Sequence, residues 1–285
     1  MAEPAIRSDA MESTGWQAAL RLGFRQIAGK TLLAERSRQG PLAVQRALYP
    51  EGDLCHVYLL HPPGGVAGGD QLRISTEVAP GATALVTTPG ATKFYRSAGP
   101  WATQRQTLRV TDGCLEWLPQ ENIIFPGARI ELATTVQLEG NARFIGWEIH
   151  CLGRPVIDEV FDHGAALFRF SLFRDGLPLL HERLEVNGQA DLGASAGLRH
   201  HPVLGTLIAT TGATAGDNGL LDTIRAQLPE SQRNRLGITE VDGLFIARYL
   251  GDSTETARAL FSDIWKALRP AVVDRPPCVP RIWNT

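Results

Sequence analysis

Long apolar runs and an excess of one charge are both missing from this sequence of 285 residues. No apolar stretch reaches the roughly 18 residues that a membrane-spanning helix needs, and residues 1–16 lack the apolar segment of a secretory signal. The formal net charge is -2 and there is no strong basic run, which argues against nucleic acid or an anionic membrane as a partner. We expect residues 1–15 to form a flexible N-terminal arm.

Cysteine is scarce, and the few that occur are scattered. The four cysteines are Cys55, Cys114, Cys151 and Cys278, and no two of them form a C-x-x-C pair. A chain of this length can bury enough apolar surface to fold without disulfides. The cysteine pattern therefore predicts a reduced, cytoplasmic protein.

Two motifs that carry chemistry in other proteins are present only in part. The glycine-rich residues 64–69 lack the Lys-Ser/Thr ending of a phosphate-binding loop, and residues 71–78 behind them have the period of a strand rather than a helix. Residues 193–197 fit G-x-S-x-G by their letters, but their flanks look like loop instead of the required strand and helix. We predict neither a nucleotide site nor a hydrolase nucleophile at these places.

Metal-binding signatures are also sparse, because no H-x-x-x-H or H-E-x-x-H occurs. The neighbours Cys55/His56 and His150/Cys151 lie in predicted strands, where adjacent side chains face opposite sides. We predict no tightly bound cofactor and no closed metal site. Weak, transient binding by imidazole is permitted, and its candidates are His61, His150, His200 and His201.

What the sequence does contain is a long series of strand patterns. Apolar and polar residues alternate in short segments, with turn signals between them roughly every 8–12 residues, which is typical of a large β architecture. No helical period interrupts the series before about residue 217, which argues against a doubly wound parallel sheet. The predicted strands are 16–25, 31–35, 42–48, 55–60, 72–78, 82–88, 102–110, 114–118, 128–137, 143–150, 168–173, 179–186, 203–210 and 244–250. Asp112-Gly113 predicts a hairpin turn.

The C-terminal part carries two helical patterns. One covers residues 217–228 and the other begins at a cap formed by Asp252 and Glu255 and ends before Pro270. Trp283 is expected to anchor the proline-rich tail. No internal repeat or linker occurs, so residues 16–285 are predicted to form a single, mainly β domain with two C-terminal helices.

Three segments place Gly and Pro beside polar groups between predicted strands: residues 61–70, 87–96 and 116–125. Glycine there permits close approach of backbone or of a partner, or it marks a crowded corner. Carboxylates also lie within the β patterns, at Glu116, Glu121, Glu148 and Glu182. They face solvent, or they line a wet polar interior in which Lys93, Arg96 and Arg154 pair with them.

The segments 61–70, 88–96 and 117–125, together with residues 152–155 and 280–283, resemble the urease accessory protein family UreD, also called UreH. The resemblance covers residue 16 to the end. It implies a non-enzymatic, cytoplasmic chaperone that binds urease apoprotein and UreF, and through UreF the GTPase UreG. It also implies a coiled, β-helix-like body and an internal channel through which nickel passes in transit to urease.

Six residues in or near the matching motifs are candidates for that channel or its support: Asp70, Thr88, Lys93, Glu121, Glu148 and Arg154. Two places depart from the family pattern as we know it. Val156-Ile157-Asp158 replaces small residues, and Pro126 stands where an acidic residue is common. The alternatives are a cytoplasmic hydrolase with an unrecognised Glu/His site and a nickel-storing protein.

Overall fold

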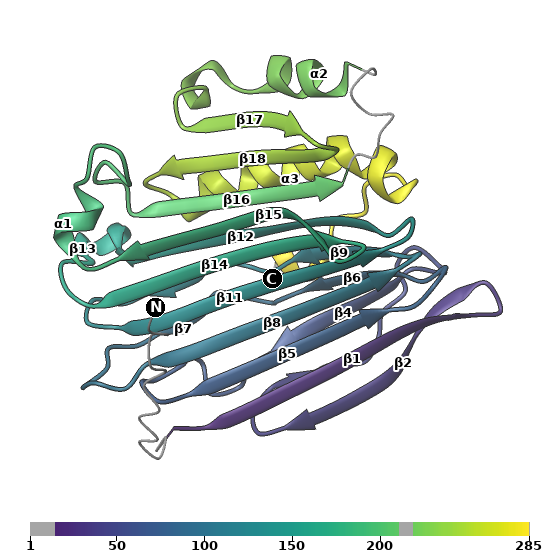
Figure 1. Ribbon diagram of the computed structural model, residues 1–285, viewed down its shortest axis with the longest axis horizontal. Helices are drawn as coiled ribbons and strands as arrows, with labels where there is room; N and C mark the ends of the chain where they lie inside the picture. The colour runs from purple at the N-terminus through teal and green to yellow at the C-terminus, as the bar shows by residue number, and fades with distance from the viewer. Residues whose placement is uncertain (1–14, 211–218, 285) are drawn as a thin grey trace, which may run out of the picture.

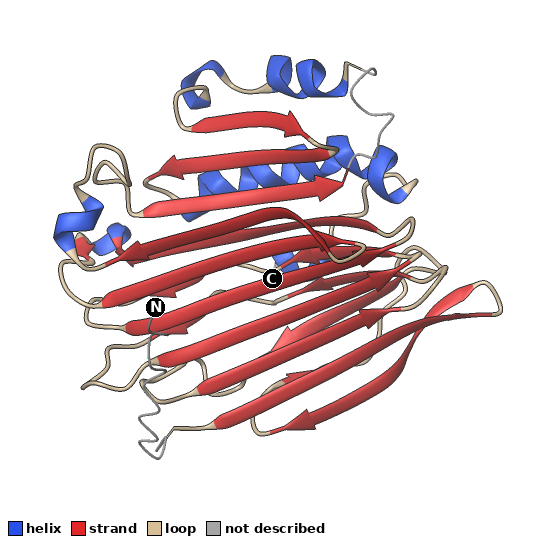
Figure 2. Ribbon diagram, in the orientation of Figure 1, coloured by secondary structure: helices blue, strands red, loops and turns tan. Residues whose placement is uncertain are grey.

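The computed structural model describes residues 15–210 and 219–284. Two β-sheets pack against each other, and a long helix covers the outer face of one of them (Figures 1 and 2). The mainly β class with a C-terminal helix is confirmed. The predicted arm, residues 1–15, lies almost wholly outside the described residues.

The smaller sheet has seven strands in the order β15-β14-β11-β8-β5-β1-β2. Its strands are β1 (Gln17–Ile27), β2 (Lys30–Gln39), β5 (Gln71–Val78), β8 (Ala102–Thr111), β11 (Arg129–Glu139), β14 (Ala165–Arg174) and β15 (Leu177–Val186). Buried and exposed residues alternate along β8 and β11, because one face meets the core and the other meets solvent.

The larger sheet has eleven strands, eight of them in the order β17-β18-β16-β12-β9-β6-β4-β3. Those eight are β3 (Ala43–Val44), β4 (Cys55–Leu60), β6 (Thr83–Thr87), β9 (Cys114–Leu118), β12 (Arg143–Arg154), β16 (Val203–Thr210), β17 (Leu236–Val241) and β18 (Leu244–Gly251). Three short strands pair beside them: β7 (Thr92–Phe94), β10 (Asn122–Ile124) and β13 (Glu159–Val160). Every residue of β9 is buried, because this sheet is covered on both faces.

The chain passes repeatedly from one sheet to the other. Strands β5, β8, β11 and β14 pair in parallel in the smaller sheet, while β4, β6, β9 and β12 do so in the larger one. The hairpin predicted at Asp112-Gly113 is therefore wrong: the turn exists, but β8 and β9 belong to different sheets. Turn residues determine a chain reversal, whereas the pairing partner depends on long-range packing. The two sheets stay open, and the β-helix-like description stays a prediction.

Within residues 15–210 and 219–284, three helices accompany the strands: α1 (Gln189–Leu192), α2 (Leu220–Gln227) and α3 (Thr254–Val273). Short 3-10 turns cover Pro155–Ile157, Glu230–Gln232 and Arg281–Asn284. The cap predicted at Asp252 is one residue early, since the hydroxyl of Ser253 accepts from the backbone N–H of Thr256 at 3.1 Å. Pro270 lies inside α3 and does not end it.

Other boundaries differ in detail. The strand predicted at 42–48 shrinks to β3, and the predicted start of the first helix at Asp217 lies outside the described residues. Buried residues form two apolar clusters, one between the sheets and one between the larger sheet and α3. Among the helices within 15–210 and 219–284, none has the length and apolarity that a bilayer crossing requires.

Candidate functional site

The three glycine- and proline-rich segments meet at one edge of the larger sheet. Each follows the carboxyl end of a parallel strand, β4, β6 or β9, and such ends lie side by side. Backbone hydrogen bonds join the segments: Val66 N–H donates to the carbonyl of Lys93 at 2.7 Å, and Thr92 N–H to that of Glu121 at 3.0 Å. The fourth motif, residues 152–155, ends β12 at the same edge, where β10 pairs with it.

Close approach within the chain explains two of these glycines. A Cβ atom on Gly65 would lie 2.2 Å from the ring of Tyr95, and one on Gly68 would lie 2.2 Å from the hydroxyl of Ser97. Neither distance is possible for a real side chain. The double-glycine loop is thus a crowded corner that packs on the segment after β7.

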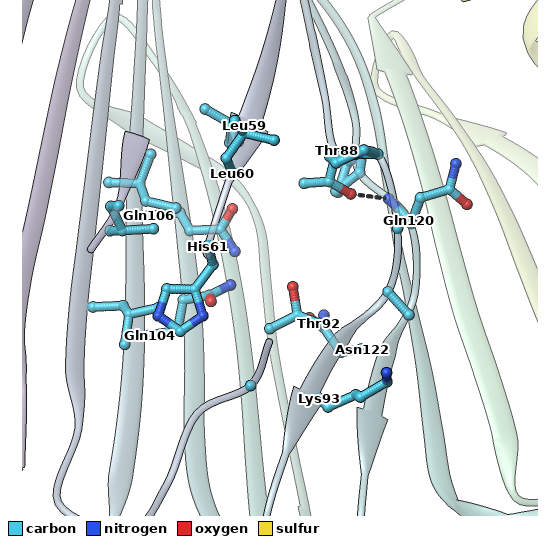
Figure 3. Close-up of a pocket in the computed structure, with 18 of the residues that line it drawn as sticks. Leu59, Leu60, His61, Thr88, Thr92, Lys93, Gln104, Gln106, Gln120 and Asn122 are labelled. Carbon is cyan, nitrogen blue, oxygen red and sulfur yellow. Dashed lines mark hydrogen bonds between the residues drawn. The ribbon is translucent and has the colours of Figure 1, made fainter. Parts of the chain in front are cut away.

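Behind this corner lies a cavity of about 190 Å³ between the two sheets. Figure 3 shows amide side chains of β8 on one wall and Thr88, Gln120 and Asn122 on the other. The hydroxyl of Thr88 accepts from the backbone N–H of Gln120 at 2.8 Å, which holds that wall together. The polar residues that line the whole cavity are His61, Thr88, Thr92, Lys93, Gln104, Gln106, Gln120, Asn122 and Glu148.

A second cavity, of about 620 Å³, lies deeper along the sheets. Strands β12, β14, β15, β16 and β18 contribute its walls. Trp117 and Glu148 line both cavities, so the two spaces meet at these side chains. The space between the sheets therefore extends from the glycine-rich edge toward β15 and β18.

Glu148 is the ionisable group at the junction. Its carboxylate accepts a short hydrogen bond from Thr134 of the opposite sheet, and the second oxygen lies 3.6 Å from Nε2 of His150. His150 stacks on Phe168 at 4.2 Å between ring centroids, and its Nδ1 is 3.3 Å from Nδ2 of Asn122. The Glu148 side chain is 17% exposed, and a partly buried carboxylate still needs hydrogen bonds or water, which these polar neighbours help to supply.

His61 lines the outer cavity, and one of its ring nitrogens is buried there. Its buried Nδ1 has no hydrogen-bond partner among the described residues. Burial lowers the pKa of His61 below its ordinary value, and the nearby Asp70 carboxylate opposes this effect only in part. The imidazole is therefore neutral at pH 7. In this form its unprotonated nitrogen can accept a hydrogen bond from water or bind a metal ion.

The six predicted channel residues divide into two groups. Thr88, Lys93 and Glu148 line cavities, whereas Asp70, Glu121 and Arg154 do not. The role of every one of them stays a prediction.

Asp70, Glu121 and Arg154 make contacts that support the fold. The Asp70 carboxylate accepts from the backbone N–H groups of Trp16 and Ala67, each at 2.8 Å, and so fastens β1 to the glycine-rich loop. Glu121 is half-buried, and its backbone carbonyl holds β7. Arg154 pairs with Glu159 and lies over the ring of Phe125 at 4.6 Å.

The weak metal candidates do not come together. His61 lines the outer cavity and His150 the inner one, while His200 is exposed in the loop before β16. His201 lies 2.8 Å from Asp252. Within the part of the chain that the structure describes, no group of three or more His, Cys, Asp or Glu side chains could hold an ion. The G-x-S-x-G letters lie in an exposed loop after α1, as expected.

The carboxylates predicted inside the β patterns find other partners than Lys93, Arg96 and Arg154. Glu116 is fully buried and pairs with Arg269 of α3 at 3.0 Å, while Trp265 donates to it at 2.6 Å. Glu182 pairs with Arg248. The spacing of residues in the sequence cannot predict a partner that lies 153 residues away in the chain, as Arg269 does from Glu116.

Sequence reasoning missed the amides that line the outer cavity. Gln104 and Gln106 are buried on the core-facing side of β8, in line with Ala102 and Leu108. A signal was present, since polar residues at two successive core-facing positions of a strand indicate an interior that is not dry.

Fold and site together define a two-sheet β protein with polar cavities between its sheets, opening where three glycine-rich segments meet. The model of the "UreD urease accessory protein" family matches residues 17–284, so the chain belongs to the UreD family of urease accessory proteins.

Relatives of nearly full length share this assignment. A urease accessory protein UreD of Alcanivorax borkumensis is 48% identical over 277 residues, covering 95% of this chain and 93% of its own. Its counterpart in Aliivibrio fischeri is 46% identical over 280 residues, covering 96% and 98%. That of Klebsiella aerogenes is 44% identical over 272 residues, covering 95% and 97%. Membership in this family supports a role in urease maturation.

Proposed function

We propose that this chain is a cytoplasmic scaffold that binds urease apoprotein and UreF, with the GTPase UreG joining through UreF. In this proposal the space between the sheets conducts nickel toward urease. The nickel ion is cargo, and the chain itself catalyses no reaction. The observation that supports conduction best is Glu148, a carboxylate where two cavities with both polar and apolar linings meet.

The chemistry of the lining fits passage better than capture. A divalent cation loses hydration energy in an apolar interior, so a conduit has to supply oxygen atoms and room for water. Amide and hydroxyl oxygens from Gln104, Gln106 and Thr88 are weak, exchangeable ligands. The carboxylate of Glu148 attracts the ion without enclosing it, whereas a closed set of thiolates and imidazoles would retain it.

The test is Glu148→Gln, which removes the charge and keeps the size. Urease, UreF and UreG are co-expressed with each variant, and urease activity and nickel content are measured after purification. We expect activation to fall about tenfold, equivalent to about 1.4 kcal/mol, while UreF is still recovered with the chain. Glu255→Gln, at an exposed carboxylate in the first turn of α3, is the matched control and should leave activation unchanged.

Two results would contradict the proposal. If Glu148→Gln activates urease as well as the control does, the ion does not depend on this carboxylate. If assembly with UreF falls in step with activation, Glu148 supports the fold and not the passage of nickel.

The competing hypotheses are separated by direct measurement. Equilibrium dialysis with nickel would show tight, saturable binding if the chain stores the metal. A hydrolase would turn over ester or amide substrates, and Glu148→Gln would abolish that turnover through the Glu148–His150 pair. Conduction predicts weak binding and no turnover.

A further inference from the structure

The outer face of the smaller sheet is broad and uncovered by any described element. Figure 1 looks directly onto it, with strands from β15 to β2 in front and α3 behind the other sheet. Seven strands about 4.8 Å apart and about 30 Å long present roughly 800–900 Å², close to one side of a standard protein–protein interface.

Register aligns arginines in a row across this face. One row joins Ala19, Arg73, Arg105, Ala133, Arg169 and Arg183 on successive strands. Arg73 therefore stands directly opposite Arg105, and Arg169 directly opposite Arg183. Like charges in such positions destabilise a sheet. Among the described residues, two carboxylates, Glu131 and Glu185, pair with the four arginines of this row, so the repulsion is relieved only in part.

The next row adds hydroxyl groups and further positive charge. It joins Ser37, Arg21, Ser75, Thr107, Thr135, Ser171 and His181. These two rows, which we call the arginine band, contain no carboxylate. The side chains of Arg105 and Arg183 are 58% and 53% exposed, so a partner can reach them although each also pairs with a glutamate, Glu131 or Glu185.

Carboxylates border the band on both sides. Glu131 lies 3.5 Å from Arg105 and 3.4 Å from Arg169, and Glu185 pairs with Arg183. Across the other border Arg21 pairs with Glu35 and Glu77. Arg73 donates to the amide oxygen of Gln71 at 3.3 Å and has no carboxylate within 4.0 Å among the described residues. The bordering carboxylates neutralise the arginine band only in part, so the band stays positively charged.

We infer that the arginine band docks a folded protein whose contact surface carries carboxylates. Arginine binds carboxylates with two parallel hydrogen bonds, and serine and threonine hydroxyls add donors beside them. A nucleic acid or an anionic membrane fits less well, because the bordering glutamates would repel a continuous phosphate surface and the chain has a net charge of -2. This inference rests on the proposed function for its probe, which is urease apoprotein.

The test reverses charge without penalising the fold. In Arg73→Glu/Arg183→Glu each new carboxylate faces the remaining arginine of its pair, which offsets the loss of the exposed Arg183–Glu185 ion pair, so thermal stability should stay close to that of the wild type. The chain–UreF complex is titrated onto immobilised urease apoprotein at low salt. We expect the reversal to weaken binding at least tenfold, Arg73→Lys/Arg183→Lys to weaken it less, and added salt to weaken the wild type.

Arg46→Glu/Arg233→Glu is the matched control, because both arginines are exposed and lie outside the smaller sheet. Binding of the reversal variant within twofold of this control overturns the inference. So does wild-type binding to phosphatidylglycerol vesicles or duplex DNA in preference to the apoprotein. If Glu148→Gln does not affect activation but the reversal variant still weakens binding, the result counts against nickel conduction. The inference about the arginine band would still hold.

Discussion

At the scale of single residues, buried charge is concentrated in one network between the larger sheet and α3. Arg269 is fully buried and pairs with Glu116 at 3.0 Å and with Glu51 at 2.7 Å. Glu51 also lies 2.7 Å from Nε2 of the buried His56. These contacts fasten the C-terminal helix to the N-terminal half of the chain. A network of this kind is costly to break, since removing one member leaves another charge buried alone.

Glu51 makes the pH dependence of this network predictable. Burial acts to raise its pKa, but hydrogen bonds from His56 and Arg269 outweigh burial and hold the pKa below its ordinary value. A carboxyl group with a lowered pKa stabilises the folded state above its unfolded pKa of about 4.3, and that stabilisation is lost as the pH falls through the folded value.

Glu51→Gln should therefore lower the free energy of unfolding at pH 7 by about 3 kcal/mol. The difference from wild type should shrink as the pH drops below about 4, because the wild-type carboxyl then also becomes neutral. Urea unfolding at several pH values measures both effects, with Glu230→Gln on an exposed turn as the control. A difference that stays constant with pH would show that Glu51 acts through packing and not through charge.

At the scale of elements, α3 shows how a start signal and a stop signal differ. Ser253 caps the helix at the predicted place within one residue, because a cap is a local hydrogen bond. Pro270 was expected to follow the helix end, yet α3 continues to Val273. Burial of Leu268, Val272 and Val273 against the larger sheet offsets the lost hydrogen bond at the proline.

Ser253→Ala should lower the free energy of unfolding by about 1 kcal/mol, because the N–H of Thr256 loses its acceptor. Ser262→Ala, inside the same helix, is the control and should be neutral or slightly stabilising, since alanine has the higher helix propensity. Chemical denaturation midpoints of the two variants settle the comparison. Equal effects would mean that the cap does not stabilise α3.

At the scale of the whole molecule, the two sheets enclose polar space where a compact β protein usually packs apolar side chains. Gln104 and Gln106 extend from β8 into it, opposite residues of the larger sheet. Such amides contribute little to stability compared with apolar side chains of similar volume. Their presence in the core suggests that these side chains serve the function of the cavity and not the stability of the fold.

The double variant Gln104→Leu/Gln106→Leu tests the stability and the function of this lining separately. We expect a thermal midpoint equal to or above that of the wild type, because apolar side chains replace buried amides. Urease activation by the variant should fall if nickel crosses this space, while UreF is still recovered with it. Gln45→Leu, at an exposed position outside the cavities, is the control. Full activation with a dry lining would count against conduction between the sheets.

Local patterns in the sequence are enough to predict the class and the position of most elements. The alternation of Leu72, Ile74 and Thr76 with polar or charged residues predicts β5. The apolar face of Leu260, Phe261 and Ile264 predicts α3. These patterns are local, because a strand or helix repeats its burial within a few residues. The glycine-rich motifs also indicated the family before any geometry was known.

The pairing of the strands, the alignment of the arginines and the contacts of the carboxylates depend on the packing of the whole chain. Asp112-Gly113 looks like a hairpin turn, yet the chain crosses there to the other sheet. The sequence suggests solvent or a cation such as Lys93 as the neighbour of Glu116, yet its partner is Arg269 of the C-terminal helix. Register and long-range contact depend on how all the strands stack together, and that stacking is a property of the whole chain.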